Sequence, residues 1–319
     1  MSDTPLTAMT AETQTGPVIP HIPEQPGVPG APQSRERNAS LWADARRELL
    51  RNPVFVMSSL YILVMLSFAT LPWLWTRKDP QDCLLDYGSM LPMGSPGHWA
   101  GTSQRGCDYW THAVYGASPS LQIAIYATTG IIAIGLPLGV LAGFYGGWVD
   151  AVISRLIDIV FALPFLLGAL VILAMLRKYN EWTITMVLVV LGWTTVARIM
   201  RGSVLATKSL DYVQAAKALG ATNSRLMFRH ILPNAIAPVF VIATVALGTF
   251  VAAEATLTFL GVGLQHPQVS WGLMISTHDD FIEQAAHLTL IPVTLLVGTV
   301  LSFILIGDAL RDALDPKLR

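Results

Sequence analysis

Long apolar stretches, each about as long as a membrane-spanning helix, alternate with short charged segments along this chain. Because a helix needs about 20 apolar residues to cross the hydrocarbon core of a bilayer, we predict six membrane-spanning helices. Their expected ranges are Val54–Trp75, Leu121–Phe144, Leu156–Leu176, Trp182–Met200, Ile236–Leu260 and Leu288–Ile306. The predicted fold class is therefore all-α, that of a polytopic membrane protein with six transmembrane helices.

The positive charges predict which side of the membrane each loop occupies. If the N-terminus lies in the cytoplasm, the 20 Lys and Arg residues divide fifteen to five in favour of the inner side. Cytoplasmic loops of membrane proteins carry such an excess. We therefore expect a multi-pass protein of the cytoplasmic (inner) membrane with both termini in the cytoplasm.

Composition agrees with lipid as the main solvent. Hydrophobic residues make up 53% of the chain and charged residues 13%, with a mean hydropathy of +0.52, whereas an average soluble domain is about 25% charged. Membrane lipid is thus an expected partner. The formal net charge of −1 indicates no particular macromolecular partner, and we expect no nucleic acid.

Composition also divides the chain into three parts. Residues 1–40 are rich in Pro, Gly, Thr and Gln with few large apolar residues, a composition typical of disorder, so we expect a disordered cytoplasmic tail. Residues 41–118 should contain the first transmembrane helix and a long external loop. Residues 119–319 should form a five-helix core, with a polar cytoplasmic segment at 208–234.

That polar segment predicts a short helix between the fourth and fifth spans. Asp211 is expected as the N-cap, with Gln214 as its reciprocal partner three residues later. Gly220 can adopt the left-handed conformation that ends a helix, and Thr222 or Asn223 can begin a second one. A small apolar face should be formed by Tyr212, Ala215, Ala216 and Leu219. A helix of about 8 residues is marginal in water, so it needs a surface, either lipid headgroups or a cytoplasmic protein.

The same segment resembles the EAA loop of bacterial ABC importer permeases. The family pattern is Glu-Ala-Ala, three residues, Gly, nine residues, Ile, any residue, Leu-Pro. Here Gln214-Ala215-Ala216, Gly220, His230 and Leu232-Pro233 keep that spacing, with Gln in place of Glu and His in place of Ile. In the family this loop forms a coupling helix that docks on the ATPase. The resemblance implies that the docking residues are Asp211, Tyr212, Gln214, Ala215, Ala216, Leu219, Gly220 and Arg225.

Further stretches resemble the C-type permeases of dipeptide and oligopeptide importers. They are Gly101–Leu121, Gly143–Leu167, Thr256–Ile275 and Leu305–Arg319. The resemblance implies a type I ABC importer (MetI-like) permease fold. It also implies three kinds of partner, namely a B-type permease subunit as heterodimer partner, two ABC ATPase subunits and an extracytoplasmic peptide-binding lipoprotein. Nickel-importer permeases share this architecture, so nickel or another small solute is the alternative cargo.

Candidate chemistry on the chain itself is sparse. A GxxxxGK[ST] loop, which cradles nucleotide phosphates, is absent from the sequence. We therefore expect a transport subunit that is not an enzyme and holds no cofactor, with ATP and Mg on partner ATPase subunits. A secondary transporter typically shows broken helices in related halves, and we find no internal repeat. An intramembrane enzyme needs a nucleophile and a base within the spans, and Ser154 and Ser302 have none beside them.

Several further residues leave two interpretations open. Cys83 and Cys107 share the external loop and form either a disulfide or two free thiols, and no metal-binding spacing is present. Glu254, an ionisable residue inside a span, either lines the translocation path or hydrogen-bonds to a neighbouring element. Asp158 is expected to pair with Arg155 or Arg198 in a structural role.

A glycine face and two basic residues complete the candidates. Gly135, Gly139 and Gly143 share one face of the second span, which indicates close packing within the chain or, alternatively, a dimer seam. Arg198 and Arg201, at the base of the fourth span, are expected to contact headgroups or join a cytoplasmic gate.

Overall fold

The computed structural model describes residues 41–83 and 89–314, with side chains from residue 46 onward. The chain divides into two compact units, Met1–Ala39 and Ser40–Arg319. The first unit, which includes the predicted tail, lies outside the described residues, and everything below concerns the second. Its described part is helical and contains no β-strand.

Five helical segments are long and apolar enough to cross a membrane. They are α2 (Pro53–Thr70), α3 with α4 (Tyr109–Tyr115 and Ala117–Tyr145), α7 (Glu181–Lys208), α11 (Ala237–Phe259) and α13 (Ala286–Leu314). These correspond to five of the six predicted spans. A further helix, α1 (Leu41–Arg51), precedes α2.

The predicted span Leu156–Leu176 is not one helix. It is divided between α5 (Gly147–Phe161) and α6 (Phe165–Leu176), which meet at an angle of 78° and make a sixth span if the bent pair is taken together. Pro164 begins α6. Proline lacks the N–H that would continue the α5 hydrogen-bond pattern, and it disfavours helical geometry at the residue before it. The break therefore follows from proline chemistry that the apolar pattern alone does not show.

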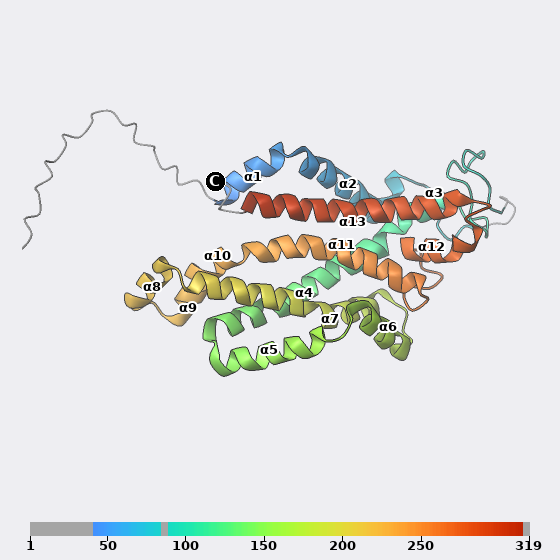
Figure 1. Ribbon diagram of the computed structural model, residues 1–319. Coiled ribbons are helices and arrows are strands. Elements are labelled where there is room, and N and C mark those ends of the chain that lie inside the picture. Colours follow the sequence, from blue (N-terminus) through green and yellow to red (C-terminus); the bar gives the residue numbers. More distant parts are fainter. Residues whose placement is uncertain (1–40, 84–88, 315–319) are drawn as a thin grey trace, which may run out of the picture. The chain divides into compact units, whose positions relative to one another are not determined.

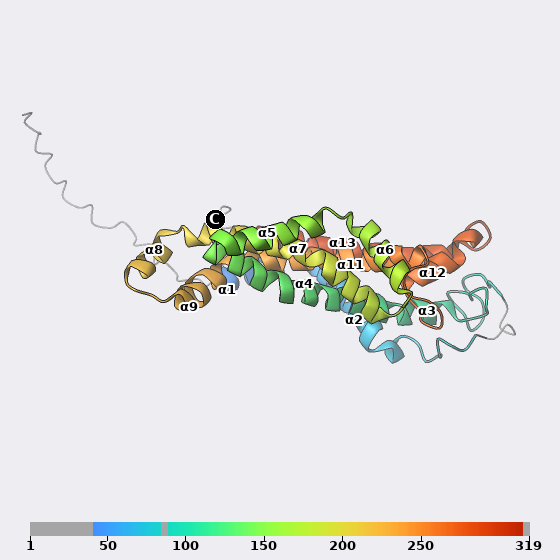
Figure 2. The ribbon, with the colours of Figure 1, turned by 90° about the horizontal axis from the view of Figure 1, so that it is seen from below.

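The short elements gather at opposite ends of the bundle (Figures 1 and 2). One end carries α8 (Asp211–Ala218), α9 (Asn223–Arg225), a π-helical turn η3 (Leu226–Ile231) and α10 (Leu232–Ala235). The other carries α3 and α12 (Trp271–His278), with the short 3-10 turns η1 (Pro72–Leu74) and η4 (Asp279–Phe281). We call these the α8 end and the α12 end.

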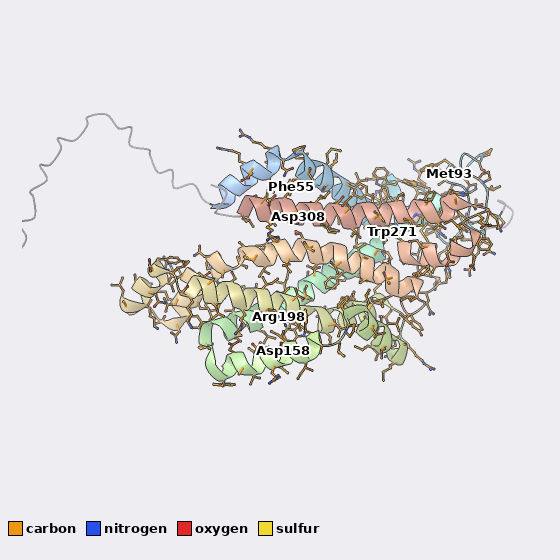
Figure 3. All side chains as sticks on the ribbon, in the orientation of Figure 1. Phe55, Met93, Asp158, Arg198, Trp271 and Asp308 are labelled. Carbon is orange, nitrogen blue, oxygen red and sulfur yellow. A yellow bond between two sulfur atoms is a disulfide. The ribbon has the colours of Figure 1, made fainter. Side chains whose placement is uncertain are left out.

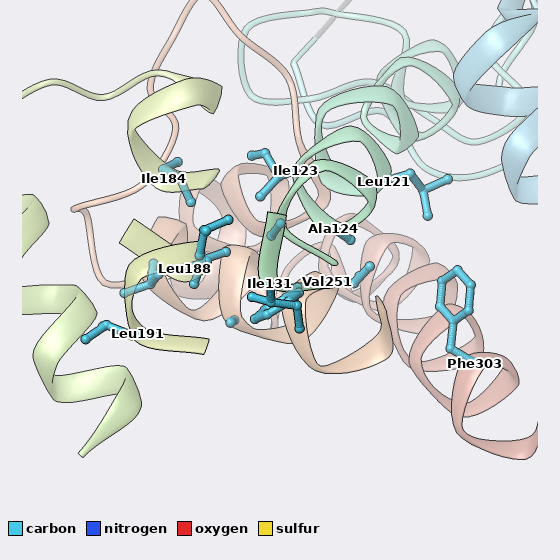
Figure 4. Packing of buried hydrophobic residues seen from close by; sticks show 14 of the residues in the cluster. Leu121, Ile123, Ala124, Ile131, Ile184, Leu188, Leu191, Val251 and Phe303 are labelled. Atoms are coloured by element: carbon cyan, nitrogen blue, oxygen red, sulfur yellow. The ribbon is translucent and has the colours of Figure 1, made fainter. Parts of the chain in front are cut away.

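The core forms around α11, which contacts α4, α7 and α13. Figure 4 shows Ile131 of α4 and Val251 of α11 close together, with Leu188 of α7 on one side and Phe303 of α13 on the other. All four side chains are buried.

The glycine face packs within the chain, which confirms the first of the two interpretations given for it. A Cβ atom built on Gly135, Gly139 or Gly143 would lie 2.5–2.8 Å from a backbone carbonyl oxygen of α7. The three residues therefore bring the α4 and α7 backbones closer than any larger residue permits. This contact places α7, which leads directly into α8, against the centre of the bundle.

Candidate functional site

The N-cap of helix α8 lies one residue before the predicted position. Leu210 is the N-cap and provides no side-chain hydrogen bond, so the prediction of Asp211 as N-cap was wrong. The reason lies in α7, which runs on to Lys208 and leaves its last carbonyl groups without helical partners. The side-chain Nε2 of Gln214 donates to the Lys208 carbonyl oxygen at 2.8 Å and fills one of these places. Gln214 thus fastens α8 to the end of α7.

The other end of α8 closes as predicted. Gly220 has φ +83°, a conformation that glycine adopts without the steric cost that a Cβ atom brings. The Gly220 N–H donates to the Lys217 carbonyl at 3.0 Å, and the Ala221 N–H donates to the Ala216 carbonyl at 3.1 Å. These two bonds form a Schellman motif.

The segment that leads from α8 to α11 begins with a second N-cap. Of the two residues proposed to begin the next helix, Thr222 is the cap, and its hydroxyl accepts from the Arg225 N–H. The chain then passes through η3 and α10 into α11.

The two faces of α8 differ in burial. Val213 is buried and Ala216 is half-buried, and both belong to the bundle core. Tyr212, Ala215 and Leu219 are exposed on the other side, and Leu219 is 89% exposed. The predicted apolar face is therefore present with one correction, because Ala216 points into the protein. The remaining predicted docking residues, Asp211, Gln214, Gly220 and Arg225, are exposed as well.

An exposed apolar strip on a two-turn helix, flanked by Lys217 and Arg225, is suited to contact with another surface. It can insert into a groove of another protein, because burial of the strip stabilises a complex and the bonds at both helix ends hold its geometry.

Ion pairs connect α5 to α7, the helix that leads into α8. The guanidinium of Arg201 binds Asp150 through two nitrogen atoms, at 2.5 Å from Nε and 2.6 Å from the second nitrogen. Arg198 lies 3.5 Å from Asp158, an exposed pair that Figure 3 shows between the two helices. Of the two partners predicted for Asp158, Arg198 is the one that pairs with it. These contacts connect the bent α5–α6 pair to the helix that carries α8.

Glu254 is enclosed rather than turned toward an opening. Its carboxylate is fully buried and accepts hydrogen bonds from Ser120 at 2.8 Å and Thr258 at 2.9 Å, with a further bond from Ser270. The described cavities do not include it in their walls. In this structure the hydrogen-bond interpretation describes Glu254, and a place for it in the translocation path stays a prediction. Glu254 joins α4, α11 and the start of α12.

This arrangement makes a testable prediction for stability. Glu254→Leu should lower the melting temperature of the detergent-solubilised protein clearly more than Glu254→Gln. Leucine leaves the Ser120 and Thr258 hydroxyls without an acceptor, at a cost of about 1–3 kcal/mol for each buried group, whereas glutamine retains a carbonyl oxygen. Equal melting temperatures for the leucine variant and the unchanged protein would contradict this role.

An apolar cavity that the sequence did not indicate lies at the α5–α6 break. It has a volume of about 480 Å³. Its walls come from four parts of the bundle and include Ile131, Phe161, Pro164, Thr195, Ile242 and Phe250. Residues at the break, among them Phe161 and Pro164, form part of its wall.

The α12 end contains the two cysteines and an ion-pair cluster. Cys83 and Cys107 form a disulfide, so the free-thiol alternative was wrong. Their sulfur atoms and a ring nitrogen of His112 lie within 4.8 Å of one another, but bonded sulfurs do not supply the thiolates that a metal ion needs. Asp108 caps α3 through the Thr111 N–H and binds Lys78 at 2.7 Å. Burial raises the pKa of Asp108, but hydrogen bonds from Lys78, Thr111 and His98 outweigh it and hold that pKa below its usual value.

Comparison with known proteins gives two family matches and several relatives. Residues 135–319 match the family described as binding-protein-dependent transport system inner membrane component. Residues 40–86 match the N-terminal TM domain of oligopeptide transport permease C. A dipeptide transport system permease protein of Alkalihalophilus pseudofirmus is 37% identical over 88% of this chain and 91% of its own length.

Two more relatives and two solved structures agree with these matches. The oligopeptide transport system permease protein of Bacillus subtilis is 34% identical over 89% of this chain and 92% of its own length. The glutathione transport system permease protein of Pectobacterium atrosepticum is 33% identical over 87% and 92%. An inward-facing structure of the MetNI methionine ABC transporter has a TM-score of 0.53 at 23% identity, covering 63% of this chain and 96% of that one. An amino acid ABC transporter has a TM-score of 0.50 at 17% identity, covering 63% and 92%. Both structures show the shared fold.

Proposed function

Because the chain belongs to the family of binding-protein-dependent transport system inner membrane components, we propose that it is one permease subunit of an ATP-driven importer. In this proposal it forms half of the translocation pathway for dipeptides and oligopeptides across the cytoplasmic membrane. The α8 end lies in the cytoplasm together with both termini, and the α12 end faces outward.

One observation carries the proposal, namely the exposed apolar strip of α8. A helix of eight residues is too short to persist alone, and here Gln214 and the Schellman motif at Gly220 hold it at the end of α7. Such a fixed, projecting helix transmits motion only if another body binds it. We assign that role to the ATPase subunits, which hold ATP and Mg, so the permease performs no chemistry.

A movement of α8 would be transmitted to the bundle through α7. Helix α7 is continuous from Glu181 to Lys208, and it contacts the α4 backbone at the glycine face. The Arg201–Asp150 pair extends the connection to α5. Closure of the ATPase dimer would therefore move α4, α5 and α7 as a group, opening the pathway formed with the second permease subunit outward. ATP hydrolysis would restore the inward-facing state.

The substrate class comes from the relatives. Those described above are named for dipeptides, oligopeptides and glutathione, all of which contain peptide-type amide bonds. An extracytoplasmic binding lipoprotein would deliver the peptide to the α12 end. Nickel is the alternative cargo.

Transport by the reconstituted complex tests the proposal. We expect proteoliposomes containing this chain, a second permease subunit and two ATPase subunits to import a labelled dipeptide when ATP and the binding protein are present. Omission of either should abolish uptake. Nickel measured in the same vesicles should remain outside. Peptide uptake by this chain alone, without nucleotide, would overturn the proposal, and uptake of nickel but not of peptide would favour the alternative cargo.

A further inference from the structure

A pocket of about 320 Å³ opens at the α12 end, away from every feature used above for coupling. Its walls come from the disulfide-bonded loop, from α3, from the segment before α12 and from α12 itself. Figure 1 shows α3 and α12 at the same end of the bundle. The volume lies within the range of small-ligand sites, about 300–1,000 Å³. The Cys83–Cys107 disulfide forms part of the wall and joins two stretches of the loop.

The pocket contains buried polar atoms that have no partner. His278 is only 4% exposed, and its Nε2 atom makes no hydrogen bond. The side-chain oxygen Oε1 of Gln268 is also buried and unpaired. Unsatisfied buried polar atoms are uncommon in folded proteins because each costs free energy. Two such residues in one pocket wall are candidates for hydrogen bonds to a bound molecule.

Both unpaired atoms are hydrogen-bond acceptors. The Nδ1 atom of His278 lies 2.9 Å from the Met274 carbonyl oxygen, which only accepts, so Nδ1 carries the proton and the neutral ring leaves Nε2 as an acceptor. Burial lowers the pKa of His278, nearby His287 and Arg105 lower it further, and this favours the neutral ring. Gln268 Oε1 is an acceptor by its chemistry. A bound molecule would satisfy both atoms with N–H or O–H donors, and a peptide carries N–H groups.

A positive charge stands at the same site. Arg105 is exposed and is the single Asp, Glu, Lys or Arg residue among the described wall residues. A guanidinium binds carboxylates through paired hydrogen bonds. Apolar atoms of Val269 and Leu273 also line the pocket and can receive a side chain.

We propose that this pocket binds the free substrate peptide, with the peptide carboxylate on Arg105 and its N–H groups on His278 and Gln268. It is a site on the outer face of the permease, where a peptide released by the binding protein waits before entering the pathway. The inference rests on the proposed function, and it adds a peptide site to the permease itself.

Direct binding tests the site. Alanyl-leucine and its C-terminal amide are titrated calorimetrically against the full permease–ATPase complex in nanodiscs, without the binding protein. We expect saturable binding of the free acid, with the amide about tenfold weaker or more, because it lacks the charged contact with Arg105. Arg105→Gln should remove that difference between the two peptides, a readout that general structural damage does not produce. Arg77→Gln, an exposed external arginine outside the pocket, is the matched control and should retain the difference.

A second variant separates binding from folding. Gln268→Met removes the unpaired acceptor at similar size, so both peptides should bind more weakly while the melting temperature stays the same or rises. Absence of saturable alanyl-leucine binding to the unchanged complex would overturn the site. An effect of Arg105→Gln on binding-protein association alone would also overturn it, in favour of a protein contact. Uptake of alanyl-leucine is measured in parallel to distinguish failure of the peptide site from failure of the proposed function. Continued ATP-dependent uptake would leave the proposed function intact.

Discussion

Leu219→Asp is expected to release the ATPase subunits from the permease and to abolish ATP-dependent transport. Leu219 is 89% exposed, more than any other large apolar side chain in the described part of the chain, and it ends the strip formed with Tyr212 and Ala215. Full burial of an exposed leucine side chain in an interface contributes about 1.5–3 kcal/mol. A carboxylate in its place adds the cost of removing a charge from water. We expect affinity to fall by about 30-fold or more.

The measurement is co-purification of the ATPase subunits with the tagged permease, together with peptide-stimulated ATP hydrolysis in nanodiscs. Leu219→Met keeps an apolar side chain of similar size and serves as the matched control, which should retain both signals. Because the side chain is exposed, Leu219→Asp should leave the melting temperature of the isolated permease unchanged. A fully coupled complex containing Leu219→Asp would remove α8 from the mechanism.

Gly139→Val is expected to disrupt the bundle itself. A Cβ atom at Gly139 would lie 2.5 Å from the Ala197 carbonyl oxygen and 2.7 Å from the Met200 Cβ, so α4 and α7 would have to separate. Overpacking of this kind costs about 1–3 kcal/mol, and we expect the upper end because the obstructing atom belongs to a helix backbone. The melting temperature should fall by about 6–10 °C, and most of the protein should fail to reach the membrane in folded form.

Gly202 provides the control for this substitution. It lies in α7, next to the same interface in sequence, yet a Cβ atom placed on it meets nothing within 4 Å. Gly202→Ala should therefore leave stability unchanged or raise it by about 0.5–1 kcal/mol, the helix preference of alanine over glycine. Thermal unfolding followed by size-exclusion chromatography compares the two variants. Equal stability of Gly139→Val and the unchanged protein would mean that α4 and α7 do not pack through the glycine face.

The candidate site shows which features local sequence rules capture. The length of α8 and its end at Gly220 follow from rules that act over a few residues, and both predictions are confirmed. The position of the N-cap was wrong because the capping rule treats α8 alone, whereas Gln214 instead bonds to the end of α7. Ala216 was assigned to the exposed strip for a related reason, since helical spacing places residues on faces without stating which face is covered.

Glu254 and the α5–α6 break show the same limit at longer range. An isolated carboxyl group in an apolar run indicates a special role, but Ser120 lies 134 residues away in sequence and is brought to it only by packing of α4 against α11. The break was within reach of the sequence, because Pro164 stands inside the predicted span.

The sequence by itself determined that this chain is an all-α membrane protein, where most of its helices lie, and that a short polar segment with importer-family spacing projects between two of them. Such properties depend on residues close together along the chain, where hydrophobic length, charge and turn chemistry act directly. Only the tertiary structure decided which polar atoms have hydrogen-bond partners and which do not. It enclosed Glu254, turned Leu219 outward and left His278 and Gln268 without partners, because burial depends on which distant helices meet.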